Sequence, residues 1–236
     1  MSEIIRATKE QLLRIGDPAY RAFQIPLIPT VSPDTVIGVR VPQLRRMAKK
    51  MTRDGRAQIY LSESILPHET YDEMNLHAFL IEGIADFDTC MHETEQFLPY
   101  IDNWATCDMF SPSVFSAEPI RLYEKICAWL QSDAEFTVRF GLVMLMRYFL
   151  GERFSPEIPV LAAQVRHTGY YVQMAVAWLF AEALARQWAD ALPYVQDAHL
   201  TPWVRRKAIQ KALESRKLND TQKAYLRALR EEGRQG

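Results

Sequence analysis

An aromatic side chain and a carboxylate stand four residues apart in the segment YIDNWATCD, which runs from Tyr100 to Asp108. If Asp102 caps a short helix that begins at Asn103, Trp104 and Asp108 lie one turn apart on one face. An aromatic face beside a carboxylate can hold a cation or stabilise positive charge that develops during a reaction. The same pattern is also typical of a core tryptophan followed by a surface or capping aspartate, so both interpretations stay open.

Three further side chains stand out because they occur in strongly apolar segments. Arg139 and Arg147 interrupt the run Phe136–Phe149, where an unpaired charge would be expensive to bury. Each arginine therefore either reaches solvent at the helix edge or faces a groove in which it meets an anion. Eight residues correspond to about 80° around a helix, so both guanidinium groups could border one groove and contact backbone phosphates. Trp178 lies in the apolar segment Tyr170–Ala185, where core packing is the more ordinary interpretation.

The motifs of the common catalytic and cofactor-binding classes are missing. The five histidines are scattered without an HExxH pattern, and the three cysteines form no CxxC pair. The sequence also has no Walker A phosphate-binding loop, no GxGxxG and no GxSxG elbow. We therefore expect no metal and no cofactor, and reduced thiols rather than disulfides.

The elements that position these residues are expected to be helices, because no stretch alternates polar and apolar residues as a strand does. Signals for helix starts recur along the chain. They are Pro42, the capping box Ser132-Asp-Ala-Glu135, the pairs Ser155-Pro156 and Thr201-Pro202, and Asn219 with Gln222 three residues later. We expect about eleven or twelve helices and no sheet.

A weak internal repeat runs through the second half of the chain, in the segments FTVRFGLVML, YYVQMAVAWL and PWVRRKAIQK. Val138 and Val172 are 34 residues apart, and Val172 and Val204 are 32 residues apart. Two helices per roughly 30 to 45 residues are typical of an α-solenoid, in which helix pairs bury their faces against neighbouring pairs. A generic helical bundle with a chance similarity is the alternative.

Charge is distributed unevenly, although the net charge is only −1. Residues 40–56 carry seven basic residues and one acid, and residues 201–236 carry ten basic and four acidic residues. Residues 57–120 carry twelve acidic residues and no lysine or arginine. The asymmetry indicates a polyanionic partner, although solvated helix faces without any partner give the same pattern. Because no secretory or membrane-spanning segment is evident, we expect a soluble cytoplasmic protein.

Four segments together, in their order and spacing, resemble the AlkD-type DNA alkylation-repair proteins. They are IGVRVPQLR (37–45), DNWATCD (102–108), VRFGLVMLMR (138–147) and YYVQMAVAWLFAE (170–182). The resemblance covers nearly the whole chain. It implies an all-α solenoid of about six HEAT-like antiparallel helix pairs, with residues 1–236 as a single domain. It also implies a concave basic groove that binds duplex DNA, so we expect the acidic residues of 57–120, apart from Asp108, mainly on the convex side.

The resemblance assigns roles to individual residues. Trp104 and Asp108 match the family's Trp-xxx-Asp unit. Arg139 matches the arginine that opens the next inner helix, and Trp178 matches the second tryptophan. With the basic segments, the expected DNA-binding residues are Arg40, Arg45, Arg139, Arg147, Arg205 and Arg206. The chain departs from the family pattern at Ala105, where an acid is expected, and at Ala181, where a basic residue is expected.

The resemblance implies a monofunctional DNA glycosylase that removes cationic N-alkylated purines, such as 3-methyladenine or 7-methylguanine, from duplex DNA. Asp108 would stabilise the sugar cation and align a water, Trp104 and Trp178 would pack against the deoxyribose, and Arg139 would clamp a phosphate. A non-catalytic nucleic-acid-binding member of the same family and a protein-interaction scaffold are the alternatives. We expect a monomer without an obligate protein partner.

Overall fold

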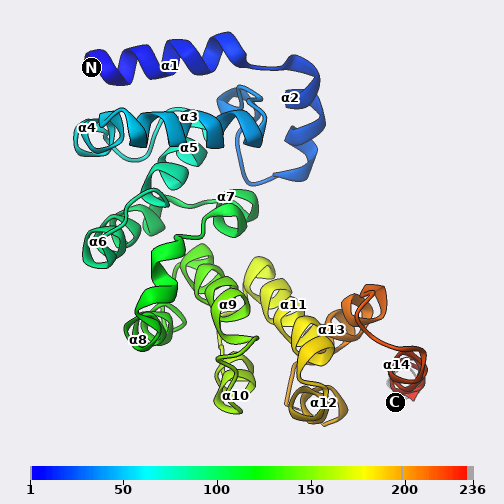
Figure 1. Cartoon of the computed structure of the whole chain (residues 1–236). Helices are drawn as coiled ribbons and strands as arrows, with labels where there is room; N and C mark the ends of the chain where they lie inside the picture. The colour runs from blue at the N-terminus through cyan, green and yellow to red at the C-terminus, as the bar shows by residue number, and fades with distance from the viewer. Residues whose placement is uncertain (1, 198, 233–236) are drawn as a thin grey trace. The chain divides into compact units, whose positions relative to one another are not determined.

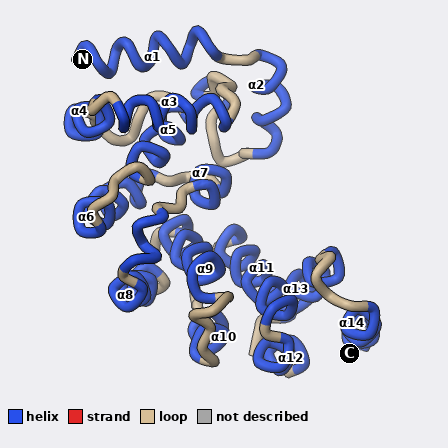
Figure 2. Tube along the Cα trace, in the orientation of Figure 1, coloured by secondary structure: helices blue, strands red, loops and turns tan. Residues whose placement is uncertain are grey.

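The computed structural model describes residues 2–197 and 199–232, and within these ranges the chain is helical with no β-strand (Figure 1, Figure 2). These residues form fourteen α-helices and four short 3-10 helices. The all-α prediction is confirmed, with more α-helices than the eleven or twelve expected. The chain divides into two compact units, Met1–Glu118 and Pro119–Gly236. The single-domain solenoid stays a prediction.

A buried helix, α5, forms the centre of the first unit. The helices of this unit are α1 (Glu3–Ile15), α2 (Pro18–Gln24), α3 (Val41–Arg53), α4 (Arg56–Glu63), α5 (Tyr71–Ile81), α6 (Phe87–Phe97) and α7 (Trp104–Met109). Every residue of α5 is buried, and α5 contacts α1, α3, α4, α6 and α7. Leu12, Leu44, Tyr60 and Leu76 join four of these helices in one hydrophobic core. Both α3 and α7 are therefore positioned against the same helix.

The second unit consists of helices that pack in chain order. They are α8 (Pro119–Trp129), α9 (Glu135–Phe149), α10 (Glu157–Ala163), α11 (Tyr170–Arg186), α12 (Trp188–Gln196), α13 (Pro202–Glu214) and α14 (Asp220–Glu232). The three repeat-like segments lie in α9, α11 and α13, which pack as neighbours (Figure 1), and α10 and α12 pack against each other and against α11. Val138, Val172 and Val204, the matching valines of the repeat, are all buried. As predicted from their composition, α9 and α11 are largely buried.

Two helix starts of the second unit follow the local sequence signals. Thr201 caps α13, since its side chain accepts a hydrogen bond from the Val204 N–H and Pro202 is the first helical residue. Asn219 and Gln222 form a reciprocal pair, in which each side-chain oxygen accepts a hydrogen bond from the other residue's N–H. Both predictions are confirmed, because the groups that satisfy the helix ends are sequence neighbours.

Two other helix starts differ from the prediction. Ser132 does not cap α9, which begins at Glu135 after the extended residue Ala134. The Glu135 carboxylate, expected to close a local capping box, accepts a hydrogen bond from the N–H of Tyr171 in α11 at 2.7 Å. A tertiary contact therefore replaces the local one. The second is α10, which begins at Glu157. Pro156, expected in its first turn, directly precedes the helix.

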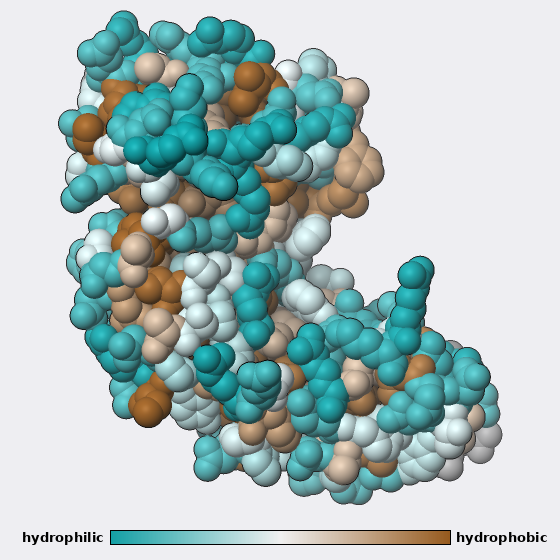
Figure 3. Space-filling view, in the orientation of Figure 1, coloured by the Kyte–Doolittle hydropathy of each residue, from teal (hydrophilic) through white to brown (hydrophobic). Residues whose placement is uncertain are grey.

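No helix in the described part of the chain is both long enough and apolar enough to cross a membrane. On the face seen in Figure 3, hydrophilic residues cover most of the surface, and small hydrophobic patches lie among them. Scattered apolar residues of this kind are normal on protein surfaces.

Candidate functional site

The short helix α7 places the predicted tryptophan and aspartate one turn apart. Its six residues run from Trp104 to Met109, and Trp104 and Asp108 are its first and fifth residues. The helix starts one residue later than expected, because Asn103 is the N-cap and its side chain accepts a hydrogen bond from the Thr106 N–H at 2.8 Å. The predicted cap, Asp102, is exposed and accepts a hydrogen bond from the Asn103 side-chain amide.

The indole of Trp104 is fixed at its polar edge and remains half-buried. Its Nε1–H donates a hydrogen bond to the Leu27 carbonyl oxygen at 2.7 Å. The ring packs against a small hydrophobic cluster that includes Ile28, Val36 and Tyr71. The two interpretations of this tryptophan are therefore compatible, since the side chain borders the core and still keeps part of its surface accessible. Asp108 is half-buried as well.

The end of α7 is held by two charged side chains from other helices. Arg45 of α3 donates a hydrogen bond from Nη2 to the Met109 carbonyl oxygen at 3.0 Å, and its Nη1 lies 2.6 Å from Glu82 Oε2. Glu82 Oε1 accepts a hydrogen bond from the Ser111 N–H at 2.6 Å. The Arg45 guanidinium also lies over the ring of Phe79, 4.0 Å from its centroid. Arg45, predicted as a DNA contact, thus has several partners inside the first unit.

A buried aspartate fixes the loop that precedes α3. The Asp72 carboxylate accepts hydrogen bonds from the N–H groups of Ile37, Gly38 and Val39, at 2.6, 3.3 and 2.7 Å. Burial raises the pKa of Asp72, and the three backbone donors act in the opposite direction. Gly38 has a φ of +90°, and an added Cβ would lie 2.7 Å from the Asp17 carbonyl oxygen. Residues 37–39 are therefore a rigid loop that leads toward α3.

Arg40 follows this loop and lies on its surface. Its Nη2 is 2.8 Å from Asp17 Oδ2, and its guanidinium lies 4.9 Å from the ring centroid of Tyr20. The hydrogen bond from the Tyr20 N–H and the Arg40 guanidinium lower the pKa of Asp17. Most of the Arg40 side chain is exposed, and the basic residues of α3 are exposed as well. Three of them, Arg45, Lys49 and Arg53, border a surface pocket of about 390 Å³.

In the second unit, Arg139 of α9 is buried, and it contacts the start of α11. Its exposed fraction is 5%, and its Nη1 donates a hydrogen bond to the Tyr171 carbonyl oxygen at 2.7 Å. Glu135, one turn earlier on α9, binds the N–H of the same tyrosine. Glu135 and Arg139 thus hold both backbone polar groups of Tyr171. Trp178 lies seven residues later on α11, nearly the same direction around the helix, and is half-buried.

The other predicted arginines of the second unit lie in different surroundings. Arg147 occupies the last turn of α9 and is exposed. Arg205 of α13 is partly buried and donates a hydrogen bond from Nε to the Val195 carbonyl oxygen at 2.6 Å. Arg206, the next residue, is exposed. Each unit therefore contains its own part of the predicted set: Trp104 and Asp108 on α7, and Arg139 and Trp178 on the neighbouring helices α9 and α11.

Comparison with known protein families accounts for this combination of residues. A family sequence model described as DNA alkylation repair enzyme matches residues 8–212. The chain belongs to the DNA alkylation repair enzyme family. The match covers most of both units and includes every predicted site residue. No curated protein matches the sequence.

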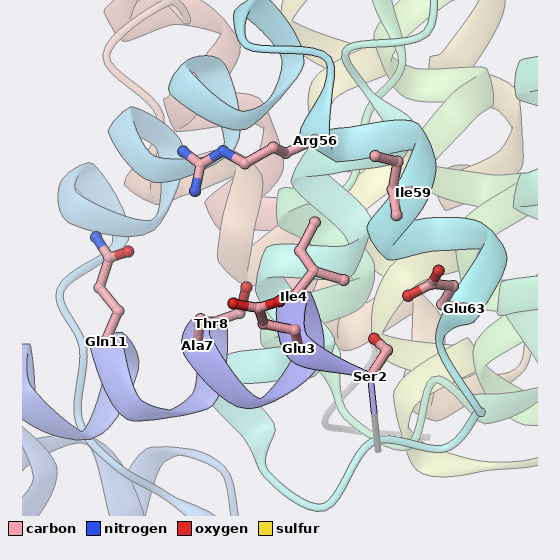
Figure 4. Close-up of a pocket in the computed structure, with 9 residues that line it drawn as sticks. All are labelled: Ser2, Glu3, Ile4, Ala7, Thr8, Gln11, Arg56, Ile59 and Glu63. Carbon is pink, nitrogen blue, oxygen red and sulfur yellow. The ribbon is translucent and has the colours of Figure 1, made fainter.

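In this member of the family, the groove drawn in Figure 4 contains none of the predicted site residues. It has a volume of about 420 Å³ and lies between α1 and α4. Gln11 extends from α1 and Arg56 from α4, and Ile4 and Ile59 contribute apolar surface (Figure 4). Arg56 also pairs with Asp54 at 3.2 Å. The groove is open and mixed in polarity, and it does not bear on the chemistry of α7.

Sequence reasoning did not single out the residues that hold α7 and the loop of residues 37–39. Asp72, Asn75 and Glu82 carry most of these contacts, and Asn75 Oδ1 is 2.9 Å from Thr106 Oγ1. Asp72 and Asn75 lie in α5, and Glu82 directly follows its last residue. The surrounding segment contains no lysine or arginine. Polar residues inside a helix that is otherwise apolar were the available signal, because a buried polar group needs a partner.

Proposed function

We propose that this DNA alkylation repair enzyme is a monofunctional DNA glycosylase. Its substrates are cationic N-alkylated purines in duplex DNA, of the 3-methyladenine and 7-methylguanine type. The observation that carries the proposal is the placement of Trp104 and Asp108 one turn apart on α7, in a chain that matches the family over residues 8–212. The fixed and partly exposed indole supports it, because a binding surface must be held in one orientation.

The proposed reaction breaks the bond between C1′ of the deoxyribose and a ring nitrogen of the base. The electron pair of this bond moves to the base, which leaves uncharged because it was cationic, and little acid catalysis is needed. A water molecule adds to C1′ and loses one proton. Asp108 stabilises the oxocarbenium-like sugar and orients the water or takes its proton. The π-face of Trp104 favours the same positive charge.

Two further predicted residues lie in the second unit. We assign Trp178 to packing against the deoxyribose. Arg139 was expected to clamp a phosphate, but only 5% of it is exposed and it holds the Tyr171 carbonyl oxygen, so we assign it to positioning α11. The contacts of Glu135 and Arg139 with Tyr171 support this assignment, because they fasten α9 to the start of the helix that carries Trp178. The exposed Arg147 and Arg206, together with Arg40 of the first unit, are proposed to contact backbone phosphates.

A HEAT-like repeat architecture with a concave basic groove belongs to the same proposal. Its support is the chain-order packing of α9, α11 and α13, which carry the repeat-like segments. The exposed side chains of Arg46 and Lys50 on α3 are further support, since phosphate contacts require accessible cations. The N-glycosidic bond is the proposed target because both carboxylate and aromatic groups suit a cationic transition state.

The test is a base-release assay with the purified chain and a duplex that contains a single 7-methylguanine. We expect free 7-methylguanine by chromatography and strand breaks only after alkali treatment of the abasic product. An unmethylated duplex of the same sequence is the control. Duplex binding that weakens steeply with salt, without base release, would identify a non-catalytic DNA-binding protein instead. Absence of both release and binding would indicate a protein-interaction scaffold.

A further inference from the structure

We propose that Arg45 and Glu82 are positioning residues that set the location of Asp108, and that Arg45 acts through this contact rather than by binding a DNA phosphate. The inference rests on the proposed function of Asp108. Its basis is the geometry at the end of α7, where both side chains hold the backbone next to the proposed catalytic carboxylate.

The helix that carries Asp108 is too short to determine its own position. With six residues, α7 has fewer than two turns, and isolated helices of this length are not stable in water. Its location therefore depends on side chains from elsewhere in the unit. Asn103 satisfies the first turn, and the Thr106 hydroxyl lies 2.9 Å from the Asn75 side-chain oxygen of α5. These contacts fix the beginning and the middle of the helix.

Arg45 and Glu82 fix its end. The Met109 carbonyl is among the last carbonyls of the helix, which have no hydrogen-bond partner within it, and Arg45 Nη2 donates to it at 3.0 Å. Two residues further on, the Ser111 N–H donates to Glu82 Oε1. The ion pair between Arg45 and Glu82, at 2.6 Å, closes the connection between these two backbone contacts. Asp108 precedes Met109 directly.

The Arg45 guanidinium is well placed for this task and poorly placed for a flexible phosphate contact. One nitrogen binds a carboxylate, a second binds a carbonyl oxygen, and Cζ lies over the ring of Phe79, 4.0 Å from its centroid. A lysine cannot make both hydrogen bonds in the same geometry, because its ammonium is a single point of charge. The contact of Arg45 with Glu82 and Met109 therefore depends on the planar shape of the guanidinium as well as on its charge.

The experiment compares variants of the full chain in single-turnover base release and in duplex binding. We expect Arg45→Met, Arg45→Lys and Glu82→Gln each to lower the release rate about tenfold, since small displacements of a reacting group reduce rates strongly. The dissociation constant for the duplex should change less than about twofold, because phosphate contacts remain. Arg53→Met is the matched control. Arg53 lies two turns later on α3 and is largely exposed, so its loss removes the same charge without touching α7.

Two further measurements separate this inference from the proposed function. In the Asp108→Asn background, Arg45→Met should have no additional effect on the rate, because it acts only through Asp108. Amide hydrogen exchange over residues 107–111 should be faster in Arg45→Met than in Arg53→Met, and this readout needs no activity. If the wild-type chain releases no base, the proposed function fails, and if Asp108→Asn releases base at the wild-type rate, the catalytic role of Asp108 fails. The exchange result still tests the contact in either case.

The positioning role is overturned by any of three results. In the first, Arg45→Met binds the duplex more weakly and with a smaller salt dependence but releases base at the unchanged rate. This result would identify a phosphate contact. The second is an equal loss of rate in Arg45→Met and Arg53→Met. The third is an undiminished effect of Arg45→Met when Asp108 is already asparagine.

Discussion

Acidification should destabilise the first unit through a pair of histidines, the partly buried His68 and the buried His77. Their rings are joined by a hydrogen bond of 2.9 Å between His68 Nε2 and His77 Nδ1. His77 stacks on Phe97 at 4.9 Å, and the ring of Tyr60 lies 5.7 Å from that of His68. If both rings were cationic, both facing nitrogens would carry a proton and the hydrogen bond would be lost. The folded state therefore disfavours protonation of the pair.

The size of the effect follows from the two pKa values. Burial lowers the pKa of His68 from 6.5 to about 4 and, with a smaller contribution from His68, that of His77 to about 3. The unfolded chain takes up protons on both rings below pH 6.5, whereas the folded unit does not. Stability is thus fully present above pH 6.5 and is lost as the pH falls toward 4. Between pH 7 and pH 5 the loss is about 2 kcal/mol for each ring and about 4 kcal/mol for both.

Hydrogen exchange of the α5 amides measures this loss within the first unit. After correction for intrinsic rates, about 4 kcal/mol corresponds to a roughly thousandfold fall in protection between pH 7 and pH 5. The double variant His68→Gln/His77→Gln should lose most of this pH dependence, because it lacks both imidazoles. Other titrating groups, such as Asp72, are the same in both proteins. His92→Gln, which removes an exposed imidazole from α6, should behave as wild type. Wild-type pH dependence in the double variant would refute the reasoning.

Two more predictions concern the loop of residues 37–39 and the proposed DNA contacts. Gly38→Ala should lower the free energy of unfolding by about 1–3 kcal/mol in urea titrations, because φ is +90° and the new methyl group meets the Asp17 carbonyl oxygen; unchanged stability would contradict a rigid loop. Arg206→Ala should reduce the slope of log binding constant against log salt by about 1 and leave the single-turnover release rate unchanged; an unchanged slope would exclude a phosphate contact.

The helical class and the buried helices could be predicted from the sequence because they depend on local composition. The apolar segments that became α9 and α11 are surrounded by protein, and Thr201 and Asn219 cap helices through residues three positions away. The spacing of Trp104 and Asp108 likewise predicted one helical turn between them, although Asn103 rather than Asp102 caps their helix.

The contacts that hold the candidate site could not be predicted in the same way, because their partners are distant in sequence. Arg45 lies in a basic segment, which pointed to DNA, but its partners Glu82 and Met109 are 37 and 64 residues away. The three backbone donors to Asp72 lie 33 to 35 residues before it. Packing of α3, α5 and α7 brings these groups together, and no local pattern encodes that packing.

The most direct test of the proposed glycosylase is the single-turnover release of 7-methylguanine by wild type and by Asp108→Asn. The account predicts a loss of about a hundredfold in rate with little change in duplex binding, since the carboxylate stabilises the transition state and not the bound duplex. The matched control is Asp102→Asn, an exposed aspartate six residues earlier, which should keep the wild-type rate. Release by Asp108→Asn at the wild-type rate would contradict the central claim.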